Sequence, residues 1–485
     1  MSEQGRKTMS AASKKSLKSS LLQLECYFTW TLLKQDVVLD ELDERLGHQL
    51  EFFTKSRITI CNLLSYISHL NDSNEKALAQ LQKAEEEIKR CHPEEIARRS
   101  IVTWGNYAWV YYHMERYEEA QRYVSKVKNT CKQLPSTPEL KAQFPEICAE
   151  EGWALMKFGK KYFERAKVCF EKALQREPNN PEFNAGYAIT VYRLECPFGS
   201  QSQALQLLQR ALELDPENTF IVVLLALKLQ DMHRTEEGER YIEEALKQTP
   251  ALPYTLRYAA KFYRRKGEVG KAMELLRKAL AVTPNPAILH HQLGLCYRSE
   301  LKQLREAVRY PPAEQVDKLI QLSISHFKAA IDRNPKFFYG HVDLARMYVE
   351  AKRYEEAEEI FQKAFQINIL SNNDKQELHY FYGSFKQFDM REESEAIQHY
   401  VEALKVQKSS CRYFARCKNA LKRLLEQRIQ RGSRDATDFG RLGFVYHLCG
   451  DTQEAIRHYK QALALHPDNE EYLSALCELR LSISS

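Results

Sequence analysis

The sequence predicts an all-α protein in which pairs of antiparallel helices stack into a solenoid. Three observations support this fold class. A pattern of small and large apolar residues recurs, with Ala211, Ala245 and Ala279 at 34-residue intervals. Gly and Pro are scarce, at 17 and 16 of 485 residues, and the strong helix formers Glu, Lys, Leu, Ala and Gln dominate the chain. This length is too great for one compact core and suits an extended array.

Each repeat contains a small residue, a large apolar residue four positions later and an alanine three positions further on. Small residues let the second helix of a pair lie close to its neighbours. In six copies a proline stands five residues after the final alanine, where it ends the helix. This arrangement is typical of tetratricopeptide repeats and predicts a superhelical solenoid. Eight copies fit the pattern, and they are Ala166–Phe170–Ala173, Ala204–Leu208–Ala211, Gly238–Ile242–Ala245, Ala272–Leu276–Ala279, Ser323–Phe327–Ala330, Ala357–Phe361–Ala364, Ala396–Tyr400–Ala403 and Ala455–Tyr459–Ala462.

The chain divides into four expected segments. Residues 1–20 are basic and Ser-rich and are expected to be a disordered tail, and residues 21–135 to hold N-terminal helices and a degenerate first repeat. Residues 136–300 hold central repeats that form a basic groove or tunnel. Residues 301–485 hold C-terminal repeats, with a basic helical region at 405–435. The gap between Ala279 and Ala330 indicates an insertion at 301–318, expected as a helix extension and a loop, and we expect soft points near 133–145 and 300–318.

Composition narrows the classes of function. The net charge of +6, from 71 Lys and Arg against 65 Asp and Glu, is too small to indicate nucleic-acid binding without knowledge of where the charges lie. The common motifs of nucleotide-binding and hydrolytic enzymes are missing, so we expect no enzymatic activity, no cofactor and no metal site. No run of about 18 apolar residues occurs, which argues against a membrane-spanning helix. Twelve cysteines, scattered singly, are typical of reduced thiols in a cytoplasmic protein.

The central repeats place cations on one predicted surface. In tetratricopeptide repeats, fixed positions of the first helix of each pair line the concave face, and the resemblance of this pattern to that family supplies the register. After Pro250 these positions hold Tyr254, Arg257, Lys261, Arg264 and Arg265. Aromatic residues such as Tyr258 and Phe220 lie among these cations. Cations neutralise phosphates and flat rings stack on exposed bases, so the groove is predicted to bind single-stranded nucleic acid.

Two other interpretations stay open. The repeat groove of such solenoids also holds peptides, and a basic groove would then suit an acidic peptide, which makes the chain a protein-interaction scaffold. The cations could also face solvent without a ligand. Several helices that direct cations at one surface repel one another unless an anion binds, and this favours a ligand.

Longer stretches carry a more specific resemblance. TWGNYAWVYYHM (103–114), EEGWALMKFGKKYFERAKVCFEKAL (150–174), RYAAKFYRRKG (257–267) and LHHQLGLCYR (289–298) resemble the interferon-induced proteins with tetratricopeptide repeats. The resemblance implies an antiviral protein of innate immunity that captures the 5′ end of single-stranded RNA. That end is a triphosphate or a cap lacking ribose 2′-O-methylation, and its capture sequesters the RNA or blocks its translation. Family members also assemble with themselves or with related repeat proteins.

The resemblance and the repeat register together imply the site residues. Four match positions that contact the 5′ phosphates, namely Arg45, Gln49, Lys157 and Arg193. Seven are expected along the following nucleotides, namely Tyr254, Arg257, Tyr258, Lys261, Arg264, His291 and Gln292. Six mark a possible cap pocket, namely Phe53, Trp153, Glu182, Ile189, Asn218 and Phe220. Phe53 replaces a smaller aliphatic residue of a cap-binding relative, and Phe163 and Phe220 replace tyrosines, so the match is weaker at the cap than at the phosphates.

Overall fold

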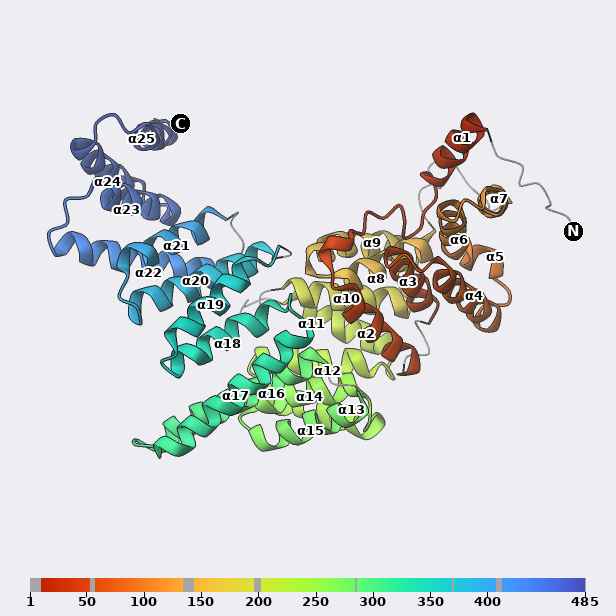
Figure 1. Ribbon diagram of the computed structural model, residues 1–485, viewed down its shortest axis with the longest axis horizontal. Coiled ribbons are helices and arrows are strands. Elements are labelled where there is room, and N and C mark those ends of the chain that lie inside the picture. The colour runs from red at the N-terminus through yellow and green to blue at the C-terminus, as the bar shows by residue number, and fades with distance from the viewer. Residues whose placement is uncertain are drawn as a thin grey trace, which may run out of the picture. The chain divides into compact units, whose positions relative to one another are not determined.

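The computed structural model describes residues 10–52, 57–133, 144–195, 202–283, 286–368, 370–406 and 412–484, and every regular element in these ranges is a helix (Figure 1). The chain forms two compact units, Met1–Gln292 and Leu293–Ser485. Within the described ranges, no helix combines the length and the apolar character needed to cross a bilayer. The four-part division expected from the sequence stays a prediction.

Unit 1 begins with N-terminal helices and continues as pairs of helices that pack on each other, such as α8 with α9 and α14 with α15. Its elements are α1 (Ala11–Leu21), η1 (Lys34–Asp36), α2 (Leu39–Phe52), α3 (Arg57–Leu70), α4 (Asn74–Cys91), α5 (Ile96–Arg99), α6 (Ile101–His113), α7 (Tyr117–Gln133), α8 (Pro145–Phe158), η3 (Lys160–Tyr162), α9 (Phe163–Arg176), α10 (Pro181–Leu194), α11 (Gln203–Leu214), α12 (Thr219–Asp231), α13 (Thr235–Gln248), α14 (Pro253–Lys266), α15 (Val269–Val282) and the start of α16 (Ala287–Ala307).

Unit 2 contains the rest of α16 and continues the paired arrangement. Its further helices are α17 (Ala313–Arg333), α18 (Phe338–Glu350), α19 (Tyr354–Phe365), α20 (Asn372–Phe388), α21 (Glu393–Lys405), α22 (Arg412–Gln430), α23 (Ala436–Cys449), α24 (Thr452–Leu465) and α25 (Glu470–Ser484).

The repeat pattern lies where the sequence predicts it. All eight copies lie on the second helix of a pair, and their small and large apolar residues are buried. In α9, for example, Ala166, Phe170 and Ala173 are 0% exposed. The ring of Phe170 fills the space above two glycines of the first helices, Gly152 of α8 and Gly186 of α10. The alternation of small and large residues, called here the size code, therefore sets how closely the helices pack. The predicted all-α tetratricopeptide-repeat fold is confirmed.

This spacing gives a stability prediction at Gly186. A Cβ there would lie 2.2 Å from Cε1 of Phe170, so Gly186→Ala should lower the free energy of unfolding by about 2 kcal/mol through overpacking. Gly270 in α15 is the matched control, because a Cβ added there would have nothing within 4 Å; Gly270→Ala should raise stability by up to about 1 kcal/mol. Urea unfolding of both variants measures the difference. Equal shifts of the same sign would contradict the size code.

The insertion expected at 301–318 is present as predicted. Helices α16 and α17 each have 21 residues, longer than the other first and second helices of the repeats, and residues 308–312 connect them. The two helices pack through Ser323, whose Oγ donates to the carbonyl of Gly294 at 3.3 Å. Tyr297 and His326 stack with ring centroids 5.5 Å apart. The extra residues therefore lengthen one helix pair instead of adding a separate element.

The disordered tail predicted for residues 1–20 is wrong for its second half. Residues from Ala11 form helix α1, whose N-terminus is capped by the Ser10 side chain. Leu17 and Leu21, one helical turn apart, are 1% and 0% exposed, and α1 packs on α6 and α7. The prediction failed because two apolar residues among many Lys and Ser are a weak signal until another helix covers them. Residues 1–9 and 134–143, the latter within an expected soft point, lie outside the described part of the chain.

Candidate functional site

The first helices of the central pairs form one continuous layer in unit 1. Contacts join α8 to α10, α10 to α12 and α12 to α14 (Figure 1). Proline occupies the first turn of α8, α10 and α14, where its missing N–H costs nothing. Asn180 caps α10 by accepting from the N–H of Glu182 at 3.0 Å. Gly267, with φ of 98°, ends α14. These residues fix where each helix begins and ends, and therefore which of its side chains lie on the same face of the layer.

Three predicted phosphate contacts lie together. Arg45 of α2 donates from Nη2 to the backbone carbonyl of Lys157 in α8 at 3.0 Å. Burial, together with the positive charges of Arg45 and Arg193, lowers the pKa of Lys157 from 10.5 to about 7. The side chain of Lys157 is half-buried. Three cations held together in this way favour an anion. The side chain of the fourth predicted contact, Gln49, lies outside the described part.

Arg193 also connects this cluster to a second one on α14. Its guanidinium lies over the ring of Phe163, with Cζ 5.4 Å from the ring centroid, and its side chain reaches Tyr258. Burial raises the pKa of Tyr258, but Arg257, Arg193 and Lys261 outweigh burial and hold it below the ordinary value. Arg257 lies over the Tyr258 ring at 4.5 Å. Burial and Arg265 lower the pKa of Lys261 to about 8.

The remaining predicted strand contacts differ in accessibility. Tyr254 is half-buried, and its ring meets the edge of Phe220 at 5.2 Å. Arg264 and Gln292 are half-buried and His291 is buried. Arg265, which the repeat register also placed in the groove, forms an ion pair with Asp231 at 2.7 Å and contributes less free positive charge.

A second part of the site combines an indole with two carboxyl groups. Trp153 of α8 meets the ring of Phe170 edge-on at 5.2 Å and is half-buried. Its indole N–H has no hydrogen-bond partner within the described residues, although the Glu182 carboxyl lies next to it. Burial raises the pKa of Glu182, and Arg99 partly offsets that rise. An aromatic face beside hydrogen-bond acceptors can hold a flat, N–H-bearing base.

Glu150 is the site residue that the sequence prediction missed. Its pKa is raised to about 7, chiefly by burial; a hydrogen bond from Asn62 at 2.8 Å opposes the rise, and the charge of Glu182 adds to it. The signal available in the sequence was its spacing, since Glu150 precedes Trp153 by three residues and shares a face of α8. A carboxyl on the apolar inner face of a helix is costly to bury and therefore marks a functional position.

The other predicted cap-pocket residues do not share this environment. Ile189 is 2% exposed and packs in the core of unit 1. The side chain of Asn218 accepts from the N–H of Ile221 at 3.3 Å and caps α12. Phe220 joins Tyr254 and Tyr258 in an aromatic cluster. Phe53 lies outside the described part of the chain.

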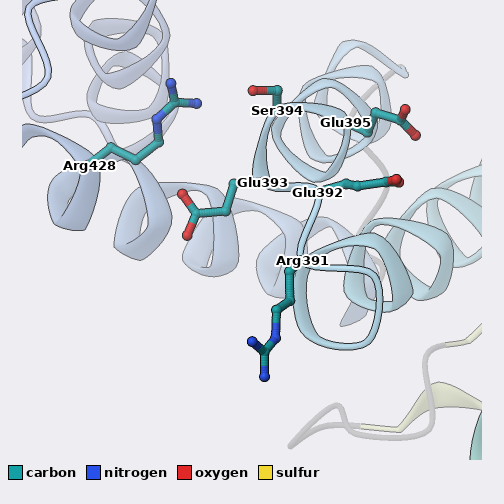
Figure 2. Close-up of a pocket in the computed structure, with 6 residues that line it drawn as sticks. All are labelled: Arg391, Glu392, Glu393, Ser394, Glu395 and Arg428. Atoms are coloured by element: carbon teal, nitrogen blue, oxygen red, sulfur yellow. The ribbon is translucent and has the colours of Figure 1, made fainter.

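A shallow pocket in unit 2 has no comparable chemistry (Figure 2). Its charged groups mostly serve the fold, because Glu392 and Glu395 bind Lys386 at 2.8 and 3.1 Å. Arg428 binds Asp438 at 3.2 Å. Figure 2 shows the side chain of Arg391 pointing away from the others. The pocket is lined by Arg391, Glu392, Glu393, Ser394, Glu395 and Arg428.

The fold defines a tetratricopeptide-repeat protein, and its layer of first helices carries a cluster of cations. Family models agree on the repeats: the tetratricopeptide repeat matches residues 148–180 and 438–469. The N-terminal repeat region of Psidin matches residues 197–303, and regulator of microtubule dynamics protein 1-3 matches residues 271–389.

Curated relatives cover almost the whole chain. The antiviral innate immune response effector IFIT1 of Macaca fascicularis is 46% identical over 466 residues, 94% of this chain and 97% of that protein. Human interferon-induced protein with tetratricopeptide repeats 2 is 43% identical over 455 residues, 92% and 95% of the two chains. The chain belongs to the family of interferon-induced proteins with tetratricopeptide repeats, as its resemblance predicted.

Solved structures of human IFIT1 share the fold. The dimer with m7Gppp-AAAA has a TM-score of 0.82 and 44% identity, and covers 93% of this chain and 100% of that one. The dimer with PPP-AAAA has a TM-score of 0.81 with the same identity and coverage. The chain is thus an IFIT1-like antiviral effector, and effectors of this family are not enzymes.

Proposed function

We propose that this protein binds the 5′ end of single-stranded RNA and thereby sequesters viral RNA or blocks its translation. The observation that carries the proposal is the cluster of Arg45, Lys157 and Arg193, in which two fixed positive charges and burial hold the pKa of Lys157 at about 7. A group of phosphates relieves this repulsion, whereas a neutral ligand does not. Human IFIT1 structures with PPP-AAAA and m7Gppp-AAAA support this choice of ligand.

The geometry supports a mechanism without sequence readout. Phosphates bind the cation cluster, and the following nucleotides pass Tyr258, Arg257 and Lys261, where rings stack on bases and cations meet the backbone. Charge neutralisation dominates this mechanism, so affinity should fall steeply with salt. Arg193 contacts both clusters, so it would take part in binding both the 5′ phosphates and the nucleotides that follow them.

A cap would bind beside Trp153. The guanine base presents N–H donors on its Watson–Crick edge. Glu182 supplies an acceptor next to the indole, and Glu150 lies near Glu182. Stacking of a methylated guanine on Trp153 would add a cation–π attraction. A cap could therefore bind in addition to the 5′ phosphates, but phosphate binding would not depend on a cap.

One binding comparison tests the proposed ends. The affinities of a single RNA carrying a 5′-triphosphate, a 5′-monophosphate, a cap without 2′-O-methylation and a cap with it separate the four cases. Equal affinity for all of them and for a 5′-hydroxyl end would show that the 5′ end is not recognised.

Trp153→Ala separates cap binding from phosphate binding. If the indole stacks on the cap, the variant should lose about tenfold in affinity for capped RNA and little for triphosphate RNA. Fluorescence anisotropy with both RNAs measures the ratio. Equal losses would mean that Trp153 only supports Phe170 and the packing of α8.

The alternative function, a scaffold for acidic peptides, rests on the same basic surface. It predicts that purified protein carries no RNA, whereas the proposed function predicts a high ratio of absorbance at 260 and 280 nm that RNase treatment removes.

We also propose that the chain assembles with itself or with related repeat proteins in the cytoplasm, in line with the dimeric structures of human IFIT1.

A further inference from the structure

A pair of histidines in unit 2 plays no part in the site of unit 1. His379 belongs to α20 and His399 to α21, and these two helices pack on each other. The two residues are 20 positions apart in the chain and share no sequence motif, which is why the sequence alone predicts no metal site here. The fold nevertheless brings their imidazole rings into contact.

The two imidazole rings face each other through their Nδ1 atoms, which lie 2.9 Å apart. In a hydrogen bond, one of these nitrogens donates and the other accepts. Two metal–nitrogen bonds of about 2.0–2.1 Å that meet at a right angle place their nitrogens at almost the same separation, about 2.9 Å. A right angle between neighbouring ligands is typical of octahedral and square-planar sites. The two rings are therefore already spaced as neighbouring ligands of one ion.

Aromatic neighbours fix the orientation of both rings. The ring centroid of Phe365 in α19 lies 5.1 Å from that of His379 and 5.6 Å from that of His399. Tyr382 meets His399 edge-on at 4.5 Å. Packing of this kind limits the rotation of the imidazoles and holds them ready for an ion. Both histidines are only half-buried, so an ion can reach them from solvent.

The charges around the pair keep both imidazoles neutral, as metal binding requires. Burial and then the charge of His399 lower the pKa of His379 to about 4. Burial and then the charge of Lys386 lower the pKa of His399 below its ordinary value. The positive charge of Lys386 is itself balanced by three carboxylates within 3.1 Å. The negative charge of Glu402 acts on both histidines and would favour a cation between them.

Glu402 is the third ligand that this arrangement offers. It follows His399 by three residues and therefore lies on the same side of α21. Its carboxylate pairs with Lys405 at 3.0 Å, and both side chains are exposed. An exposed ion pair contributes little to stability, so Glu402 can leave it and turn toward an ion. Within the described residues, no three His, Cys, Asp or Glu side chains already converge on one metal position, so this turn is needed and water completes the coordination.

We propose that His379, His399 and Glu402 bind one divalent transition-metal ion and that this ion fastens α20 to α21. The inference goes beyond the proposed function and does not depend on it. Two imidazoles and one carboxylate suit Zn²⁺, Ni²⁺ or Cu²⁺, whereas Mg²⁺ and Ca²⁺ prefer oxygen ligands alone. A plain hydrogen bond between the two histidines is the competing explanation of their contact, and it predicts no affinity for a metal ion.

Calorimetric titration of the full chain with Zn²⁺, after treatment with EDTA, tests the site. One ion per chain should bind, and saturation should raise the Tm because the ion binds only the folded helix pair. His379→Asn with His399→Asn should lower the affinity more than about a hundredfold, the most that is lost with a residue that only supports a ligand. The matched control is His447→Asn with His466→Asn. It removes two exposed imidazoles from the end of the chain and should leave the titration unchanged.

A second variant keeps the contact between the histidines. Glu402→Gln retains both imidazoles and should still weaken Zn²⁺ binding at least about tenfold, and circular dichroism checks that every variant keeps its helices. No binding of Zn²⁺ to the natural chain, or equal binding to the double variant of His379 and His399, overturns the proposal. An equal loss in the control would mean that Zn²⁺ binds exposed histidines anywhere, which also overturns it. If the double variant does not fold, Glu402→Gln decides alone, and unchanged affinity there refutes the three-residue site.

Discussion

Arg193→Glu should abolish measurable binding of 5′-triphosphate RNA. The substitution removes one of the two fixed charges beside Lys157 and places a carboxylate in the same position. It also breaks the contact between Arg193 and Tyr258 that joins the phosphate cluster to the strand. Reversing a charge in a partly desolvated site costs about 3 kcal/mol or more, so affinity should fall at least a hundredfold. Fluorescence anisotropy with 5′-triphosphate AAAA measures this loss.

A charge reversal elsewhere in the same repeat controls for net charge. Arg210 lies exposed on α11 and pairs with Glu213 at 3.1 Å, so Arg210→Glu should change affinity less than threefold by screened, long-range effects alone. Arg193→Lys keeps the charge but loses the planar group over Phe163 and should retain most of the binding. Full affinity in the Arg193→Glu variant would remove the basis of the proposed site.

The fold was largely predictable because the spacing of residues within each repeat determines how its two helices pack. Small residues at fixed intervals, such as Ala204 and Ala211, can be read without knowledge of their neighbours, and they define both helices of a pair. Helix α1 was not predicted because it depends on what covers Leu17 and Leu21. A local pattern predicts an element well only where the element does not rely on distant contacts.

The candidate site was predictable in part. The register and the family resemblance identified Lys157, Arg193 and Arg257 from the sequence. They did not predict how the charges of these residues affect one another. The ion pair of Arg265 with Asp231 joins residues on adjacent helices, and the accessibility of Ile189 depends on the packing of unit 1. Glu150 was not predicted because a glutamate in a helix is ordinary until its burial is known.

Binding of 5′-triphosphate RNA should weaken as the pH rises above neutrality. In the free protein the pKa of Lys157 is about 7, because burial and then Arg45 and Arg193 disfavour its charge. Phosphates favour the charged form, so binding takes up a proton and raises this pKa. Above the free pKa each pH unit then costs up to tenfold in affinity per proton taken up, or roughly twentyfold between about pH 7.5 and 9. A terminal phosphate, with a pKa near 6, is already ionised in this window.

Lys157→Arg isolates this effect from other groups that titrate nearby. Lys261, whose pKa is lowered to about 8, loses its charge over the same window. The pKa of Tyr258 lies below its ordinary value. Both remain in the variant, whereas an arginine at position 157 stays charged at every pH in the window. Anisotropy titrations at several pH values should therefore show a markedly smaller loss in Lys157→Arg than in the natural chain. Identical pH profiles would mean that Lys157 is charged before RNA arrives and that its burial has no part in binding.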